Sequence, residues 1–215
     1  MDKEEEGKLM LSVDIEKELE LFKLDIKFNI GKEVLAIQGA SGSGKTTILN
    51  IIAGLVKADR SEIANGDVIL ESSNKKIYLP SRNRNVGYMF QNYGLFPHLN
   101  VEKNIKFAMK DNELYDILLD VLNLTDLLKR YPSDISGGEK QRVALLRTLV
   151  TKPEVLLMDE PFSALDTELK EKLYPSFGEL IKSLDIPVLI ITHDNDEAKI
   201  LADKIIHIDK GRITA

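Results

Sequence analysis

The stretch that decides the fold of this chain is Gly39-Ala40-Ser41-Gly42-Ser43-Gly44-Lys45-Thr46. It matches the phosphate-binding loop G-x-x-x-x-G-K-[ST], whose glycines let several backbone N–H groups point at one anion. The apolar run 34–37 before the loop predicts a buried strand, and apolar residues at helical spacing from Ile48 to Leu55 predict a helix after it. Strand, loop and helix are the context that the motif requires, because the helix N-terminus adds positive partial charge.

The loop predicts a site for a nucleoside triphosphate. Lys45 is expected to reach the β- and γ-phosphates, and the Thr46 hydroxyl to bind Mg²⁺. The candidate nucleotide-binding residues of this stretch are Gly39, Ala40, Ser41, Gly42, Ser43, Gly44, Lys45, Thr46 and Thr47. Kinases, GTPases and transport motors share such a loop, and a flexible glycine turn is the alternative without function. The rest of the chain has to decide between them.

Composition indicates a folded domain with a hydrophobic core. The chain has 215 residues, of which 43% are hydrophobic and 30% charged, as in soluble globular proteins. Its net charge of −6 argues against attraction of nucleic acid or of an anionic membrane by the electrostatic field of the whole protein. The absence of cysteine excludes disulfides. No apolar stretch approaches the roughly 20 residues that span a bilayer, so we expect any membrane role to pass through a partner chain.

The order of predicted elements indicates an α/β fold. The strands at 9–15 and 19–30 are expected to pair as an N-terminal antiparallel β subdomain, because apolar and polar residues alternate in the second. Further strands are predicted at 68–70, 86–90, 155–158, 187–192 and 204–209, and helices at 169–184 and 195–202. Alternating strands and helices predict a central, mostly parallel sheet.

The chain divides into a tail and one domain. Residues 1–8 are charged without a hydrophobic pattern and are expected to form a flexible tail before the domain 9–215. From about 92 to 146 apolar residues recur at helical spacing and no strand is predicted. We therefore expect a helical subdomain inserted in the nucleotide-binding core.

Two acids directly follow the buried run 155–158. Ligands of open α/β sheets bind at the carboxyl ends of the strands, so Asp159 suits a carboxylate for Mg²⁺ and Glu160 a base that orients and deprotonates a water. Two solvated acids are the alternative. Gln91 and His193 also follow predicted strands, and each is ambiguous by itself.

A second anion-binding arrangement is Ser136-Gly137-Gly138-Glu139, a serine and two glycines at the start of a predicted helix. One chain has no second phosphate for it, and a plain N-cap and turn would explain the same residues.

Together these motifs resemble the nucleotide-binding subunits of ABC transporters, from about residue 10 to the end. The matches are Walker A at 39–46, the Q-loop at Gln91, the signature at 135–142, Walker B at 155–160, the D-loop at 163–166 and the switch histidine at His193. The signature departs mildly from the family pattern, with Ile135 for Leu and Glu139 for Gln.

The resemblance implies a P-loop NTPase that binds and hydrolyses ATP with Mg²⁺ as a head-to-tail homodimer. Each ATP would lie between the Walker motifs of one chain and Ser136, Gly137, Gly138 and Glu139 of the other. The implied catalytic residues are Lys45, Gln91, Glu160 and His193, and the implied Mg²⁺ ligands are Thr46, Gln91 and Asp159. The chain would act at the cytoplasmic face of the cell membrane, on transmembrane permease subunits served by a solute-binding protein, without nucleic acid.

Residues 79–91, 95–98 and 135–143 resemble molybdate importer ATPases, with sulfate and iron importers as alternatives. Many molybdate ATPases carry a C-terminal ligand-binding domain, which we expect to be absent because the chain stops at Ala215. A P-loop kinase or GTPase would explain the loop but not the Ser136 helix start, and there is no N-K-x-D motif. A non-transport ABC protein would share the motifs but usually carries two cassettes.

Two expectations concern the contacts of such a subunit. ABC ATPases commonly stack adenine on an aromatic residue upstream of the phosphate loop, but no aromatic residue precedes Phe22, which is in phase with Leu24 and is expected to face the core. Selectivity for the base should therefore be weak. The segment 91–101 is rich in apolar residues and is expected to dock the membrane partner, with packing inside the helical subdomain as the alternative.

Overall fold

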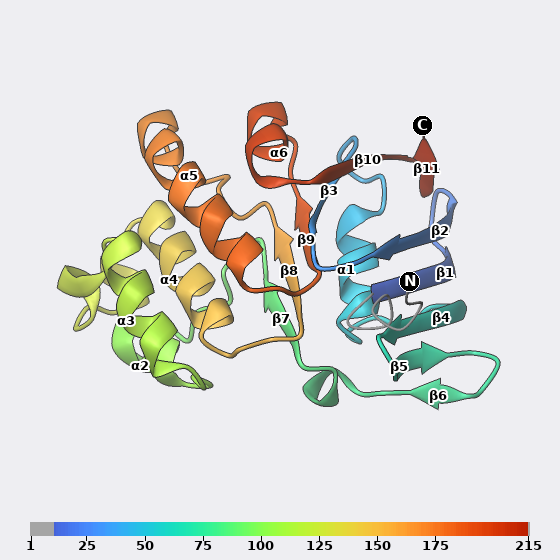
Figure 1. The fold of residues 1–215 in the computed structure, drawn as a ribbon, viewed down its shortest axis with the longest axis horizontal. Helices are drawn as coiled ribbons and strands as arrows, with labels where there is room; N and C mark the ends of the chain where they lie inside the picture. The colour runs from blue at the N-terminus through green and yellow to red at the C-terminus, as the bar shows by residue number, and fades with distance from the viewer. Residues whose placement is uncertain (1–10, 215) are drawn as a thin grey trace, which may run out of the picture.

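The computed structural model describes residues 11–214, and one 11-stranded sheet runs through them. The strand order is β6-β5-β4-β1-β2-β11-β10-β3-β9-β8-β7, with α2 to α5 gathered beside the β7 end (Figure 1). The predicted α/β fold, with a mostly parallel central sheet and N-terminal antiparallel strands, is confirmed. The expected tail 1–8 lies outside the described residues.

The parallel half of the sheet is made by β10, β3, β9, β8 and β7. In this order the strands span Lys204–Asp209, Val34–Gln38, Val188–Ile191, Val155–Asp159 and Val86–Met89. Strands β3, β8 and β9 are buried along their whole length. The apolar runs that predicted them are continuous because both faces of a parallel sheet are covered.

Alternate residues of β8 pack into different core clusters. Val155 and Leu157 join the cluster that contains α1 (Lys45–Ile52). Leu156 and Met158 join the cluster that contains residues of α4 (Gly137–Leu149) and α5 (Thr167–Ser183). The last helix, α6 (Asn195–Leu201), lies between β9 and β10 in the chain. Because β3, β8 and β9 run parallel, the loops after them meet at one edge of the sheet.

The antiparallel half contains three strands that the sequence did not predict. Strands β1 (Leu11–Glu18) and β2 (Lys23–Ile30) form the expected hairpin. The remaining strands are β4 (Arg60–Asn65), β5 (Val68–Ser72), β6 (Ile77–Tyr78) and β11 (Arg212–Thr214). Strand β4 was missed because polar side chains, Ser61 and Asn65, take two of its buried positions, and its pairing with β1 holds it. Strands β6 and β11, with two and three residues, are too short for a periodic pattern.

Helices α2 (Val101–Lys106), α3 (Asn112–Val121) and α4 lie between β7 and β8, where the structure assigns no strand. Side chains at Asn100, Asp111 and Ser136 accept a backbone N–H and begin these helices. The helices occupy one end of the molecule in Figure 1. The exact boundaries of a helical subdomain at about 92 and 146 stay a prediction, and α4 continues to Leu149.

The first helix is shorter than predicted. Helix α1 ends at Ile52, and Leu55 is 48% exposed, so its assignment to the apolar helix face was wrong. Gly54 has φ 73°, a left-handed conformation that ends a helix. The end of α1 also meets Arg84, whose Nη1 donates to the carbonyl oxygens of Ile51 and Ile52.

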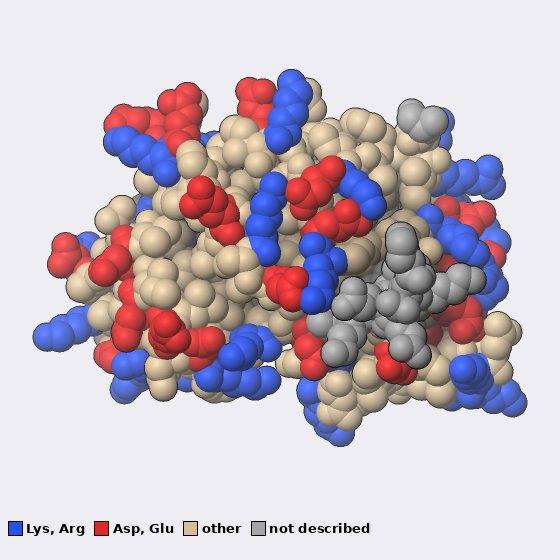
Figure 2. Space-filling view, viewed as in Figure 1, with Lys and Arg blue, Asp and Glu red and all other residues tan. Residues whose placement is uncertain are grey.

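The surface of the described residues carries charges of both signs. Positive and negative side chains are interspersed over the face in Figure 2. Arg60, for example, pairs with Asp14 and Glu16 across β4 and β1. Within residues 11–214, each helix is too short or too polar to cross a bilayer.

Candidate nucleotide-binding site

The phosphate-binding loop has the backbone that only glycine accommodates. Gly42 and Gly44 have φ values of 78° and 104°, and Gly44 is the N-cap of α1. A Cβ at Gly39 would lie 2.1 Å from the carbonyl oxygen of Ile208, and a Cβ at Gly44 would lie 2.9 Å from Cδ1 of Leu24. The loop is therefore packed closely between β10 and β2, with the N-terminus of α1 facing outward.

Lys45 is folded back over the mouth of the loop. Its Nζ donates to the carbonyl oxygens of Gly39 and Ala40, both at 2.8 Å. Burial lowers the pKa of Lys45, while the nearby charges of Glu160 and Asp159 raise it. The ammonium is thus held beside the first two residues of the loop.

Thr46 contacts the end of β8. Its Oγ1 donates to Oδ2 of Asp159 at 2.8 Å, and Asp159 is 3% exposed. Burial raises the pKa of Asp159, against the opposing effect of the Thr46 hydrogen bond. A hydroxyl and a carboxylate side by side suit a hard cation such as Mg²⁺.

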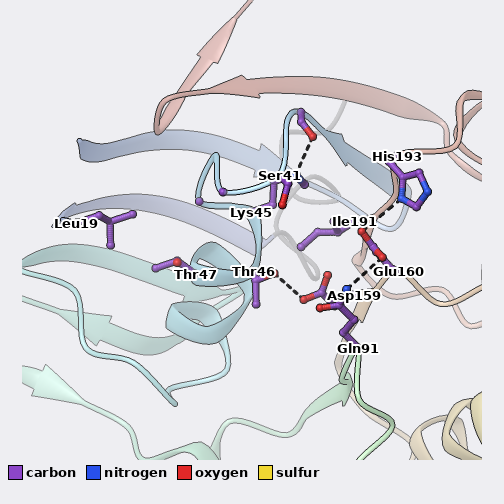
Figure 3. Close-up of a pocket in the computed structure, with 13 residues that line it drawn as sticks. Leu19, Ser41, Lys45, Thr46, Thr47, Gln91, Asp159, Glu160, Ile191 and His193 are labelled. Atoms are coloured by element: carbon purple, nitrogen blue, oxygen red, sulfur yellow. Dashed lines mark hydrogen bonds and ion pairs between the residues drawn. The ribbon is translucent and has the colours of Figure 1, made fainter. Parts of the chain in front are cut away.

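Glu160 joins three segments that are distant in the sequence. Its Oε2 accepts a hydrogen bond from Nε2 of Gln91 at 3.2 Å, and its Oε1 lies 3.4 Å from Nδ1 of His193 (Figure 3). Gln91 follows β7 and His193 follows β9, so the three side chains meet because their strands end at the same edge of the sheet.

These residues line one cavity of about 340 Å³. The predicted site residues around it are Gly39, Ser41, Gly42, Gly44, Lys45, Thr46, Thr47, Gln91, Asp159, Glu160 and His193. Ala40 and Ser43 belong to the loop but do not line the cavity, and the Ser43 side chain is buried. In the described part of the chain, no group of three or more His, Cys, Asp or Glu residues could hold a metal ion alone. A Mg²⁺ ion here would need oxygen ligands from a nucleotide and water as well.

The second predicted arrangement lies outside this cavity. Ser136 caps α4 through a capping box: its Oγ accepts from the N–H of Glu139 at 3.3 Å, and Oε2 of Glu139 accepts from the N–H of Ser136 at 2.7 Å. Ser136 and Gly137 are exposed, and a Cβ at Gly138 would lie 3.0 Å from Cδ2 of Leu165. The structure therefore presents this helix start to the solvent, away from the phosphate loop of its own chain.

The hairpin between β1 and β2 contributes a residue that the sequence reasoning missed. Leu19 lines the cavity together with Ile191. Phe22 was expected to face the core rather than the nucleotide. It does not line the cavity, but it is only half-buried before β2 begins, and its ring lies beside Gly211 and Gly44 rather than in a core cluster. The break of the apolar alternation at residues 19–22 was the signal that this segment is a turn rather than a strand.

The sequence pattern of the ABC transporter family matches residues 22–163. The chain belongs to the ABC transporter family. This segment contains the phosphate loop, Gln91, the Ser136 helix start and the Asp159–Glu160 pair of the cavity. In this chain the phosphate loop and the acidic end of β8 line one cavity, and the exposed start of α4 lies outside it.

Curated relatives and solved structures agree with the family. The molybdenum import ATP-binding protein ModC of Haemophilus ducreyi is 44% identical over 96% of this chain, and that of Vibrio vulnificus is 45% identical over 89%. The chain spans 60% and 53% of the lengths of these two relatives. The dimeric structure of MJ0796, a bacterial ABC transporter cassette, is 26% identical, with a TM-score of 0.80 over 95% of this chain and 97% of its own. A second MJ0796 structure, a dimeric post-hydrolysis state bound to ADP and Pi, has a TM-score of 0.77.

Proposed function

We propose that this chain is the ATP-binding and ATP-hydrolysing subunit of an ABC importer. The observation that carries the proposal is the single cavity in which Lys45, Thr46 and Asp159 meet the cluster of Glu160, Gln91 and His193. The post-hydrolysis MJ0796 structure, with ADP and Pi bound, supports a triphosphate as the substrate of this fold.

In this proposal one set of residues binds the phosphates and the metal, and another set acts on the attacking water and the γ-phosphate. The backbone N–H groups of the loop and the Lys45 ammonium hold the phosphates, and Thr46 and Asp159 would hold Mg²⁺, which neutralises charge on the phosphates. Glu160 takes a proton from the attacking water. Gln91 orients that water and would also contribute an oxygen ligand to Mg²⁺, and His193 contacts the γ-phosphate.

Hydrolysis by two matched variants tests this assignment. Glu160→Gln should lower the turnover of ATP by roughly 10²–10⁴-fold, with nucleotide binding retained. Glu154→Gln is the control, because Glu154 is exposed and lies just before the opposite end of the same strand. Equal turnover in the two variants would remove Glu160 from the role of base.

We further propose that two copies of the chain complete each ATP site. Ser136, Gly137, Gly138 and Glu139 would bind the nucleotide held by the phosphate loop of the other chain. The exposure of Ser136 and Gly137 supports this arrangement, since a helix start of this kind suits an anion and the cavity of its own chain lies elsewhere. The dimeric cassettes of MJ0796 support the same assembly.

The transported solute is proposed to be molybdate, carried by separate permease subunits at the cytoplasmic face of the cell membrane. The names of the curated relatives support this choice over sulfate or iron. Uptake of molybdate by cells that express the permease and this chain tests it, with Lys45→Ala as the inactive control. Uptake of sulfate but not of molybdate would replace the solute and leave the ATPase proposal intact.

The permease is proposed to dock beside the segment 91–101. Tyr93 and Leu95 pack against the core, but the ring of Phe96 lies tilted against that of Phe107, with ring centroids 4.8 Å apart, and Phe107 is 66% exposed. These two rings border a hollow of about 270 Å³ next to Arg147. An exposed aromatic hollow suits a partner with an apolar helix.

Cross-linking tests this docking site. The chain has no cysteine, so His98→Cys provides a unique thiol at an exposed position of the segment. It should capture the permease subunit in membranes, whereas a cysteine at exposed Asp126 should not. Equal capture by both, or only intramolecular products, would contradict the site.

A further inference from the structure

Gln141 makes a set of contacts that the proposed function does not use. It lies in α4 and is 1% exposed. Its Nε2 donates to the carbonyl oxygen of Glu160 at 3.1 Å and approaches Oγ of Ser163 at 3.4 Å, and its Oε1 accepts from the N–H of Ala164 at 3.2 Å. Both ends of one buried amide therefore bind the loop that follows β8.

Glu160 is the residue of this loop whose backbone most needs support. Its φ is 52°, in the left-handed region that residues other than glycine avoid unless the surroundings hold them there. Its N–H donates to the carbonyl oxygen of Ile191 at 2.9 Å. Its carbonyl oxygen accepts from Gln141, and from Oγ of Ser163 at 3.1 Å. These contacts set the direction in which the Glu160 side chain leaves the strand.

We propose that Gln141 is a positioning residue for ATP hydrolysis, which holds the Glu160 peptide so that its carboxylate faces Gln91 and His193. Gln141 does not line the cavity, so it acts through Glu160 and not on the nucleotide. The inference rests on the proposed role of Glu160 as base. A displacement of about 1 Å at a reacting group costs up to roughly 100-fold in rate, and the amide is the buried side chain that resists such a displacement.

The contacts of the Gln141 side chain with Glu160 and Ala164 require one donor and one acceptor on the same side chain. The opposite orientation of the amide would set Oε1 against the carbonyl oxygen of Glu160 and Nε2 against the N–H of Ala164, so both contacts would be repulsive. A glutamate at position 141 has the same shape. Ionised, it cannot donate to Glu160, but protonated it donates through its O–H and accepts from Ala164 with the other oxygen.

This difference gives a test within one folded variant. At pH 8, Gln141→Glu and Gln141→Met should both lower kcat by about 10- to 100-fold, with the Kd for ATP changed by less than about twofold. As the pH falls to 6, the activity of Gln141→Glu relative to the wild type should recover, while that of Gln141→Met should not. Thr148→Val is the control for the loss of a buried polar side chain in α4. The hydroxyl of Thr148 donates to the Ala144 carbonyl oxygen of the same helix and not to the loop after β8.

Coupling to Glu160 is measured by a double variant. In a Glu160→Gln background, Gln141→Met should cause no further loss of turnover, because the group that it positions is already absent. The inference would be overturned by any of three results. These are additive losses in the double variant, a wild-type kcat in Gln141→Met, and an activity of Gln141→Glu relative to the wild type that does not change with pH. If Glu160→Gln itself keeps wild-type turnover, the proposed function fails instead, so the two failures are distinguishable.

Discussion

The buried acid Glu197 makes the stability of this cassette depend on pH. Glu197 lies on α6, shortly after His193, and is 2% exposed. Its Oε1 has no hydrogen-bond partner among the described residues, and its Oε2 lies 3.5 Å from the hydroxyl of Tyr174. Burial raises its pKa to about 7, while Thr192 and Lys170 lower it. Between pH 4.5 and about 7 the carboxyl group is therefore neutral in the folded protein and ionised in the unfolded chain.

The sign and size of the effect follow from this difference. Below pH 4.5 the Glu197 carboxyl group is protonated in both states, so its ionisation does not lower the free energy of unfolding. Between pH 4.5 and about 7 the unfolded chain releases the proton and the folded protein keeps it, so the free energy of unfolding falls as the pH rises. At about 1.4 kcal/mol per pH unit, the total loss is about 3 kcal/mol above pH 7.

Urea unfolding of the wild type and Glu197→Gln at pH 4.5 and pH 8 measures this loss. Glutamine is neutral at every pH, so the variant should gain about 3 kcal/mol relative to the wild type between the two values. Taking the difference removes the contribution of all other carboxyl groups. Glu179→Gln, at an exposed position of α5, should show no such gain. If the difference in free energy of unfolding between Glu197→Gln and the wild type changes by less than about 0.5 kcal/mol from pH 4.5 to pH 8, the assignment of a buried neutral carboxyl group is refuted.

Two further predictions concern the base and the end of α1. Because Leu19 and not an aromatic ring lines the cavity beside the loop, competition binding should show a preference for ATP over GTP below about tenfold; a larger preference would require a stacking residue elsewhere. Arg84→Met should lower the free energy of unfolding by about 3–5 kcal/mol, because Glu71 loses its buried partner at 2.9 Å and α1 loses two carbonyl contacts. Adding Glu71→Gln should recover part of that loss in urea unfolding, and no recovery would contradict the ion-pair explanation.

The parallel core could be predicted from the sequence because its signals are local. The loop glycines and Lys45 form a fixed pattern, and the run 155–158 is apolar throughout because β8 is buried on both faces. Asp159 and Glu160 were placed at the site by a rule about strand ends alone. The structure brings them to the cavity with Gln91 and His193.

Other features depend on contacts that no local pattern encodes. Strand β4 exists because β1 pairs with it, although its buried positions include Ser61 and Asn65. Leu19 lines the cavity only because the hairpin folds over the phosphate loop. Gln141 lies in the signature segment 135–142, but the sequence did not indicate a role for its side chain, and its three contacts appear only once α4 packs against the loop after β8.

The claim that two chains complete each ATP site is tested most directly by mixing Lys45→Ala and Ser136→Arg chains. In the mixed dimer both changes fall on one composite site, so the other site should bind one ATP and hydrolyse it, whereas either variant alone should be inactive. Nucleotide stoichiometry and turnover, measured on the purified mixed dimer with Mg²⁺, give the answer. Absence of activity after mixing, or two equally occupied sites, would contradict the account.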